Sequence, residues 1–303
     1  MDLAITRPIR LALGGRSAGT GVCGAGSALA MLALFLFAAP ALAELPCTPA
    51  SPCEVEDGRY LASAPEDWDG VTPLPAVVFF HGWQSSAELV LGNRVLIDRL
   101  HDAGHLVILP DGRAKTWAHV GSPSQRRDEI PFIRAVVADA AARFPIDRGR
   151  LWVSGFSQGG SMAWDVACTL GSAFTAFAPV AGAFWEPLPD ICPGGPVNLR
   201  HIHGTSDRVV PMAGRPIREI FRQGDVRAGM AVLRRTDRCP AAPSAVVEED
   251  GLRCEVWGNC ATGKELQLCL HADGHEMPDG WLDSTLAWLE SLPAWGQETA
   301  SPP

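Results

Sequence analysis

The chain has 303 residues, 47% of them hydrophobic, and its 25 basic and 34 acidic residues give a formal net charge of −9. This acidic composition holds no basic block, which argues against nucleic acid or an anionic membrane as a partner. The length suffices for one substantial hydrophobic core, and a single domain of this size is common among α/β proteins.

Residues 1–43 are typical of a secretion signal. Three arginines precede a short apolar run that ends at Ala41-Leu42-Ala43, a small-residue spacing suited to signal peptidase. The run is short for a membrane span, and an uncleaved N-terminal anchor is the alternative. We therefore predict a secreted or periplasmic protein without stable membrane insertion. Its residues 44–303 form a single domain in which 22 basic and 33 acidic residues leave a charge of −11.

Cysteine usage also favours export. Of the nine cysteines, Cys23 lies inside the predicted signal and eight remain. An even number in an exported chain predicts disulfide bonds, although their connectivity is not fixed by sequence. Proximity along the chain favours Cys47 with Cys53 and Cys168 with Cys192. The alternative, a zinc site, has no C-x-x-C motif to support it.

From residue 75 onward, short apolar runs alternate with longer amphipathic stretches. The runs that predict strands are 75–80, 105–110, 150–155, 174–182, 198–204 and 265–270. The spacing of apolar residues predicts a helix over 128–144, with Asp128 as its N-cap, and a last helix over 279–292. This alternation predicts an α/β fold, a mostly parallel central sheet with helices on both faces. In such sheets functional residues collect at the carboxyl ends of the strands.

The stretch "LWVSGFSQGGSMAWDV", residues 151–166, carries the strongest chemical signal. Ser157 follows a predicted strand directly and precedes a helix that begins near Gly159. A nucleophile elbow needs small residues around its serine because the tight turn brings backbone segments close together. Gly155, Gly159 and Gly160 meet that need. We predict that Ser157 is a nucleophile; a serine in an ordinary Gly-rich turn is the alternative.

A serine hydroxyl needs a base, which in this type of sheet follows a later strand than the serine does. His275 lies in a Gly-containing loop after the last predicted strand. His271 is the rival, but it adjoins the strand end and is expected to belong to the ladder. The sequence therefore favours His275 as the general base.

Asp207 is the predicted acid, because it lies in a turn after the strand that precedes the last one. A carboxylate buried beside an imidazole fixes its tautomer and stabilises the imidazolium. A surface turn aspartate is the alternative. Asp190 lies too close to the preceding strand, and Asp225 and Asp237 are expected on helical or loop surface.

The remaining histidine pattern, His201-x-His203, faces one side of a predicted strand. No carboxylate or cysteine is spaced to complete a metal site with it, so packing beneath the acid loop is the interpretation. We predict neither a metal nor any other cofactor.

Two backbone N–H groups are predicted to hold the oxyanion. One belongs to Gln158, directly after the nucleophile, and the other to Trp83, in the loop after strand 75–80. Gly82 lets that loop pass close to Ser157, although a Gly turn without a role is the alternative.

Two tryptophans and an aspartate lie in neighbouring loops. Trp117 and Trp185 follow strands and are candidates for apolar walls of a substrate pocket, with packed loop anchors as the equal alternative. Asp111, in "LPDG", is interpreted as a turn residue.

Five motifs in order, "HGWQSS", "LPDG", "VSGFSQGGSMAW", "HGTSDRVVP" and "DGHEMP", resemble the secreted esterase family related to polyhydroxybutyrate depolymerases and feruloyl esterases. The resemblance covers about residues 58 to 290. It implies an α/β-hydrolase fold and a catalytic triad of Ser157, Asp207 and His275. The loop after His275 departs from the family, since it reads Glu276-Met277-Pro278 where many members have Trp-Pro.

Together, the residues and the resemblance predict a secreted serine carboxylic-ester hydrolase, polyhydroxybutyrate depolymerase-like or feruloyl esterase-like, that forms an acyl-enzyme on Ser157. The expected partner is a small-molecule or oligomeric ester. A serine peptidase or an acyltransferase with the same triad is one alternative, and a non-catalytic surface binding protein on this scaffold is another. The acyl group, the alcohol and the oligomeric state are not predicted.

Overall fold

The computed structural model describes residues 47–297. These belong to one compact unit, Glu44–Pro303. The predicted signal segment, 1–43, lies outside the described residues. Among the helices in 47–297, none is both long and apolar enough to cross a membrane.

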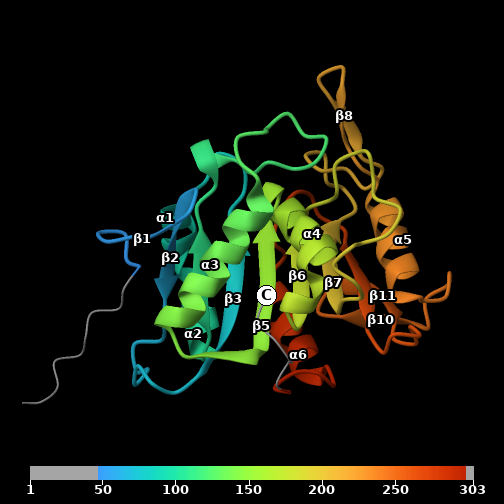
Figure 1. Cartoon of the computed structure of the whole chain (residues 1–303). Coiled ribbons are helices and arrows are strands. Elements are labelled where there is room, and N and C mark those ends of the chain that lie inside the picture. The colour runs from blue at the N-terminus through green and yellow to red at the C-terminus, as the bar shows by residue number, and fades with distance from the viewer. Residues whose placement is uncertain (1–46, 298–303) are drawn as a thin grey trace, which may run out of the picture. The chain divides into compact units, whose positions relative to one another are not determined.

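Within this range a ten-stranded sheet has the order β1-β2-β4-β3-β5-β6-β7-β12-β11-β10 (Figure 1). Its central strands are parallel: β4 (Leu106–Pro110), β3 (Leu74–Phe80), β5 (Ile146–Phe156), β6 (Ala176–Val180), β7 (Leu199–Gly204) and β12 (Leu266–His271). Each corresponds to one of the six predicted apolar runs, so the mostly parallel sheet is confirmed. The assignment of His271 to the end of a strand is confirmed as well.

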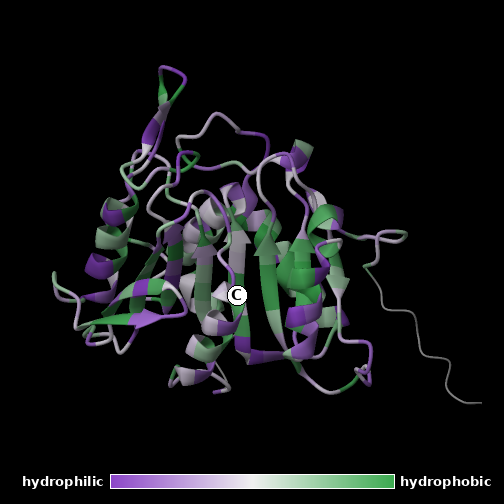
Figure 2. Cartoon of the chain, turned by 180° about the vertical axis from the view of Figure 1, so that it is seen from behind, coloured by the Kyte–Doolittle hydropathy of each residue, from purple (hydrophilic) through white to green (hydrophobic). Residues whose placement is uncertain are grey.

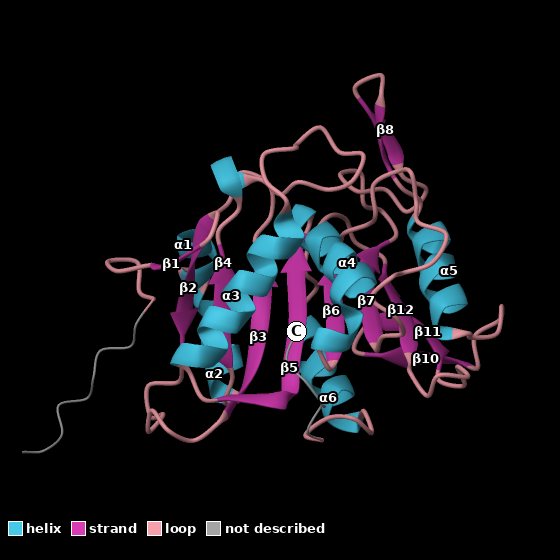
Figure 3. Cartoon of the chain, viewed as in Figure 1, coloured by secondary structure: helices cyan, strands magenta, loops and turns pink. Residues whose placement is uncertain are grey.

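Antiparallel strands extend both edges of the sheet. They are β1 (Cys53–Val55) and β2 (Gly58–Ser63) at one edge, and β11 (Leu252–Trp257) and β10 (Ala245–Glu249) at the other. A separate two-stranded ribbon, β8 (Arg215–Ile217) and β9 (Phe221–Gln223), projects beyond the carboxyl ends of the central strands (Figure 3). The sequence predicted none of these shorter strands.

The helices are α1 (Ala87–Leu91), α2 (Arg94–Asp102), α3 (Glu129–Arg143), α4 (Gln158–Leu170), α5 (Val226–Asp237) and α6 (Trp281–Ser291), with single 3-10 turns at Arg113–Lys115 and Gly171–Ala173. The three predicted helices match: α3 begins after Asp128, whose side chain accepts the N–H of Ile130, α4 begins at Gln158, and α6 lies within 279–292. Helices therefore alternate with the central strands as predicted.

Successive side chains along each strand point to opposite faces of the sheet, so the hydrophobic core has two parts, one on each face. In β3, Ala76, Val78 and Phe80 pack with α3, α4 and α5, whereas Val77 and Phe79 pack with α1, α2 and α6. Seen from behind, much of the hydrophobic colour lies on strands in the middle of the sheet (Figure 2). Burial on both faces explains why these strands read as continuous apolar runs.

Four disulfides connect elements around this core. The predicted pairs Cys47–Cys53 and Cys168–Cys192 are both present. Two further pairs, Cys239–Cys260 and Cys254–Cys269, connect the loop after α5 to the loop before β12, and β11 to β12. Such cross-links stabilise a fold largely by limiting the unfolded chain.

Candidate active site

Ser157 lies at the sharp turn between β5 and α4. Its backbone has φ 60° and ψ −121°, a region that a residue other than glycine rarely adopts. The turn is held by the Ser157 N–H, which donates to the Val180 carbonyl at 3.0 Å, and by the Ser157 carbonyl, which accepts the Ser161 N–H at 2.9 Å. The structure thus places the serine in a strained elbow at the N-terminus of a helix.

The glycines around the elbow are needed for space. A Cβ at Gly159 would lie 2.0 Å from the Phe80 carbonyl oxygen, and one at Gly155 would lie 2.4 Å from the carbonyl oxygen of Gly159. A Cβ at Gly160 would come within 2.4 Å of the Val180 carbonyl oxygen. Each is a clash with backbone, so the G-x-S-x-G-G pattern follows from the packing of α4 against β3 and β6.

The structure brings Ser157, His275 and Asp207 into one hydrogen-bonded chain. His275 Nε2 lies 2.8 Å from Ser157 Oγ, and His275 Nδ1 lies 2.7 Å from Asp207 Oδ2. His275 belongs to the loop after β12 and Asp207 to the turn after β7. These loops pack closely, because a Cβ at Gly204 would lie 2.2 Å from the Gly274 carbonyl oxygen.

Asp207 is held as a carboxylate. Its Oδ1 accepts the backbone N–H groups of Val209 at 2.7 Å and Val210 at 2.8 Å. Burial raises the pKa of Asp207, but the hydrogen bonds from His275, Val210 and Val209 and the charge of His275 together outweigh it, so the pKa lies below its ordinary value. The group is therefore ionised at neutral pH.

The two strand histidines lie beneath this turn. Their rings are fully buried, His201 Nε2 lies 2.9 Å from His203 Nδ1, and His203 Nε2 lies 2.7 Å from the Val210 carbonyl oxygen. Burial lowers the pKa of both rings. They support the backbone that positions Asp207, as the packing interpretation expects.

Both predicted oxyanion donors border Ser157. As the first residue of α4, Gln158 has no intrahelical acceptor for its N–H. The loop that carries Trp83 passes close by, since a Cβ at Gly82 would lie 3.5 Å from the Ser157 Cβ. His81 holds this loop, because its Nε2 accepts the Gly112 N–H at 2.9 Å while its Nδ1 lies 2.8 Å from the Gly82 carbonyl oxygen.

The side chain of Gln158 has a function that sequence reasoning missed. Its Nε2 donates to Thr116 Oγ1 at 2.9 Å and to the Trp117 carbonyl at 3.3 Å. The side chain thereby fixes the start of α4 to the loop after β4. The two segments are about forty residues apart, and no local pattern signals their contact.

A cavity of about 520 Å³ opens above Ser157. Trp83 and Trp185 contribute to its walls, together with Val209, Val210 and Ile217. Trp185 therefore lies where the sequence predicted an apolar wall.

The pocket prediction is wrong for Trp117, which lines neither this cavity nor the one beside it. Its ring is fully buried, its Nε1 donates to the His81 carbonyl at 2.8 Å, and it packs edge-on against Phe80. The alternative, a packed loop anchor, describes it.

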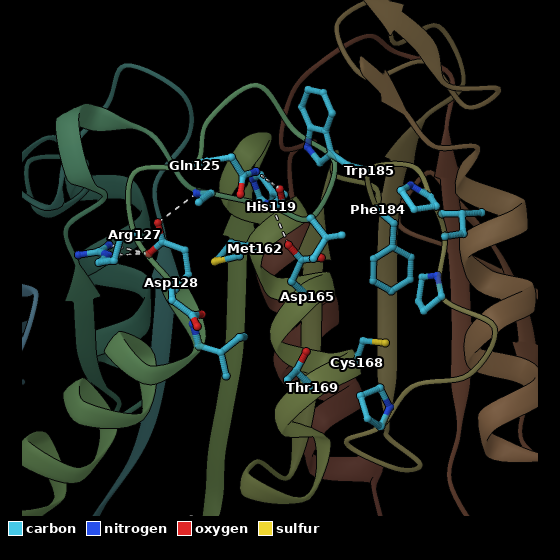
Figure 4. A pocket seen from close by; sticks show the side chains of 18 of the residues that line it. His119, Gln125, Arg127, Asp128, Met162, Asp165, Cys168, Thr169, Phe184 and Trp185 are labelled. Atoms are coloured by element: carbon cyan, nitrogen blue, oxygen red, sulfur yellow. Dashed lines mark hydrogen bonds and ion pairs between the residues drawn. The ribbon is translucent and has the colours of Figure 1, made fainter. Parts of the chain in front are cut away.

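A second cavity, of about 760 Å³, lies beside the first and shares Gln125, Arg126 and Trp185 with it (Figure 4). Here His119 Nδ1 lies 2.7 Å from Asp165 Oδ2, while His119 Nε2 is buried without a partner in the described residues. The two side chains come from the loop after β4 and from α4. The sequence analysis did not single out either of them.

The other aspartates have structural surroundings. Asp111 accepts hydrogen bonds from the Arg59 guanidinium, at 2.8 Å and 3.1 Å, and anchors the start of α1. Asp225 caps α5 through the Ala228 N–H, and Asp190 is exposed. The expected surface position is wrong for Asp237, which is fully buried at the end of α5, because its carboxylate accepts the Val197 N–H inside the fold. Burial raises its pKa to about 7.

Within residues 47–297, no three His, Cys, Asp or Glu side chains come together in a group that could hold a metal ion.

No known protein-family profile matches the chain. Curated relatives are nevertheless found by sequence. Feruloyl esterase B of Piromyces equi is 24% identical over 252 residues, 78% of this chain and 46% of the relative. The putative esterase NocK of Nocardia uniformis is 26% identical over 68% of this chain and 66% of its own length. Feruloyl esterase D of Neurospora crassa is 27% identical over 72% of this chain and 73% of its own length.

The first two matches thus span about half to two thirds of the relatives' length.

Among solved structures, an acetyl xylan esterase from Aspergillus awamori superimposes with a TM-score of 0.59 and 15% identity over 77% of this chain and 93% of its own. A Bacillus cereus carboxylesterase superimposes with a TM-score of 0.51 and 11% identity, with the same coverage of 77% and 93%. The predicted α/β-hydrolase fold and the resemblance to feruloyl esterases are therefore confirmed, and the chain is a relative of carboxylic ester hydrolases.

Proposed function

We propose that the chain is a serine carboxylic-ester hydrolase that cleaves its substrate through an acyl-enzyme on Ser157. The observation that carries the proposal is the continuous hydrogen-bonded chain from Ser157 Oγ through His275 to Asp207, with distances of 2.8 Å and 2.7 Å. A nucleophile, a base within reach of its proton and an acid that orients the base are the groups that acyl transfer requires.

In the first half-reaction, Ser157 Oγ attacks the ester carbonyl carbon while His275 Nε2 takes the hydroxyl proton. The ionised Asp207 stabilises the imidazolium that forms, because its carboxylate lies 2.7 Å from Nδ1. The N–H groups of Trp83 and Gln158 stabilise the oxyanion, aided by the positive end of α4. His275 then returns the proton to the departing alcohol.

In the second half-reaction, a water molecule attacks the acyl-enzyme and gives its proton to His275. The second oxyanion collapses, the acid leaves, and the proton returns to Ser157 Oγ. No cofactor enters either step, since the histidine supplies every proton transfer.

The finer assignment is a feruloyl esterase-like or polyhydroxybutyrate depolymerase-like enzyme exported to an oxidising compartment. Three observations support it: curated relatives named feruloyl esterases, the five ordered motifs, and four disulfides, which are typical of exported proteins. Trp83 and Trp185 give the cavity aromatic walls suited to an aryl or acyl group.

The test compares Ser157→Ala with Ser172→Ala, an exposed serine just past the other end of α4. Initial rates are measured on 4-nitrophenyl esters, methyl ferulate, an acetylated xylose oligomer and hydroxybutyrate oligomers. Loss of the nucleophile is expected to lower kcat by about 10⁴-fold or more, whereas the control keeps the wild-type rate. Full activity of Ser157→Ala would refute the mechanism.

Covalent labelling gives an independent readout. A fluorophosphonate should modify Ser157 in the wild-type protein and in Ser172→Ala but not in Ser157→Ala, as judged by peptide mass spectrometry. Labelling of another serine instead would assign the chemistry elsewhere.

A further inference from the structure

Three arginines line the cavity above Ser157. Arg126 comes from the loop between β4 and α3, and Arg215 and Arg218 come from the β8–β9 ribbon. None of the described residues that line this cavity is acidic. A cationic cavity stands out in a chain whose net charge is −9, because its local potential opposes that of the molecule as a whole.

The three guanidinium groups lack counter-charges. No carboxylate within residues 47–297 lies within 4.0 Å of the guanidinium of Arg126, Arg215 or Arg218. Arg215 donates only to uncharged oxygens, at 2.9 Å to Gln223 Oε1 and at 3.5 Å to the Arg208 carbonyl.

Arginines just outside the cavity behave differently. Arg222, on the same ribbon, lies 3.1 Å from Glu186, and the buried Arg127 lies 2.6 Å from Glu129. These two arginines are paired with carboxylates, whereas the three that line the cavity have no carboxylate within 4.0 Å among residues 47–297. An anion that enters the cavity therefore meets guanidinium groups that no carboxylate of the described residues occupies.

The β8–β9 ribbon borders the same cavity as Ser157. Gln223, which accepts the Arg215 hydrogen bond, forms an isolated β-bridge with Trp185, and both residues line the cavity. The ribbon is thereby tied to the aromatic wall. Apolar surface from Trp83, Val209 and Ile217 lies in the same cavity, where it suits the hydrocarbon part of a ligand.

Building on the proposed esterase function, we propose that the preferred substrate is an ester that also carries a carboxylate. The guanidinium groups of Arg126, Arg215 and Arg218 bind that carboxylate while the ester carbonyl lies at Ser157. The carboxylate belongs either to the acyl half, as in a monoester of a dicarboxylic acid, or to the alcohol half.

The test uses two pairs of substrates that differ in one charge. Mono(4-nitrophenyl) glutarate against 4-nitrophenyl pentanoate places the carboxylate in the acyl half. Then 4-acetoxybenzoate against 4-acetoxybenzamide places it in the leaving alcohol. The wild-type protein is expected to show a kcat/KM about 10-fold or more higher for the anion in one pair, which identifies the half that the arginines bind.

The arginine variants assign the preference to residues. Arg126→Gln, Arg215→Gln and Arg218→Gln are each expected to lower the anion-to-neutral ratio of kcat/KM by about 3- to 10-fold, and raised salt should lower it as well. Arg222→Gln is the matched control, because it removes the same charge from the same ribbon outside the cavity. It should leave the ratio at the wild-type value.

Equal kcat/KM values within both pairs would overturn the inference while leaving ester hydrolysis intact. So would a preference that survives in the triple arginine variant. Absence of turnover on every ester, together with absence of labelling at Ser157, would overturn the proposed function and this inference with it.

Discussion

The structure contains two histidine–aspartate pairs with the same contact geometry, one bonded to Ser157 at the first cavity and one lining the second cavity. The distance from Nδ1 to Oδ2 is 2.7 Å both in His275–Asp207 and in His119–Asp165. They differ at the other ring nitrogen. His275 Nε2 lies 2.8 Å from Ser157 Oγ, whereas His119 Nε2 is buried without a partner among the residues of the described range.

The two pairs also differ in which of the two side chains is fully buried. In the Ser157 pair the aspartate side chain is fully buried and the histidine side chain is 15% exposed, so the acid is shielded from water and the base is partly open to it. In the second pair His119 is fully buried and Asp165 is 20% exposed. The His119 ring stacks against Trp185, with ring centroids 6.1 Å apart, and so packs the wall between the cavities. A histidine–aspartate hydrogen bond alone does not make a base; access to a hydroxyl does.

The largest expected effect is a difference in kcat/KM between variants of Asp207 and of Asp165. Asp207→Asn removes the charge that stabilises the imidazolium and changes the favoured tautomer of His275, so kcat/KM should fall by about 10⁴-fold. Asp165→Asn makes the same isosteric change in the second pair and should alter kcat/KM by less than about 3-fold. Initial rates on a 4-nitrophenyl ester, with circular dichroism as a check on folding, measure both. Equal losses in the two variants would mean that the second pair takes part in turnover.

A smaller effect is expected in the free energy of unfolding, which should differ between variants of His119 and of His275. His119→Gln removes a buried ring, its stacking on Trp185 and part of its bond to Asp165, so the free energy of unfolding should fall by about 2–3 kcal/mol. His275→Gln alters a ring that is partly exposed and should change it by less than about 1 kcal/mol. Urea unfolding at pH 7 gives both values. A greater loss for His275→Gln would contradict the packing role assigned to His119.

The sequence predicted the central sheet and the Ser157 pair because their signals were local. Each central strand is buried on both faces and so reads as an apolar run, and the elbow must contain small residues wherever backbones touch. The order serine, acid, histidine then led to Asp207 and His275. The edge strands carry no comparable run; β10, for example, is exposed along most of its length.

The features that were missed depend on contacts between distant segments. His119 and Asp165 are 46 residues apart, and no motif connects them. Arg126 lies far along the chain from Arg215 and Arg218, so a scan for basic blocks finds nothing, although the fold gathers them in one cavity. Trp117 and Trp185 look alike in sequence, and only packing shows that one is a buried anchor and the other a wall.

The smallest effect concerns Asp237, a buried carboxylate without any histidine. It accepts the Val197 N–H at 3.3 Å, and burial raises its pKa to about 7, the opposite direction to Asp207. In the unfolded chain the pKa is about 3.9, so between about pH 4 and pH 7 the folded state binds more protons and its stability falls as pH rises. Asp237→Asn cannot titrate. The free energy of unfolding of the variant should equal that of the wild type near pH 4 and exceed it by about 1–2 kcal/mol at pH 8. This gain is smaller than the pKa difference alone would give, because the new amide group needs a hydrogen-bond partner. Urea unfolding of both proteins from pH 4 to pH 8 measures the difference; parallel curves would show that burial does not raise the pKa of Asp237.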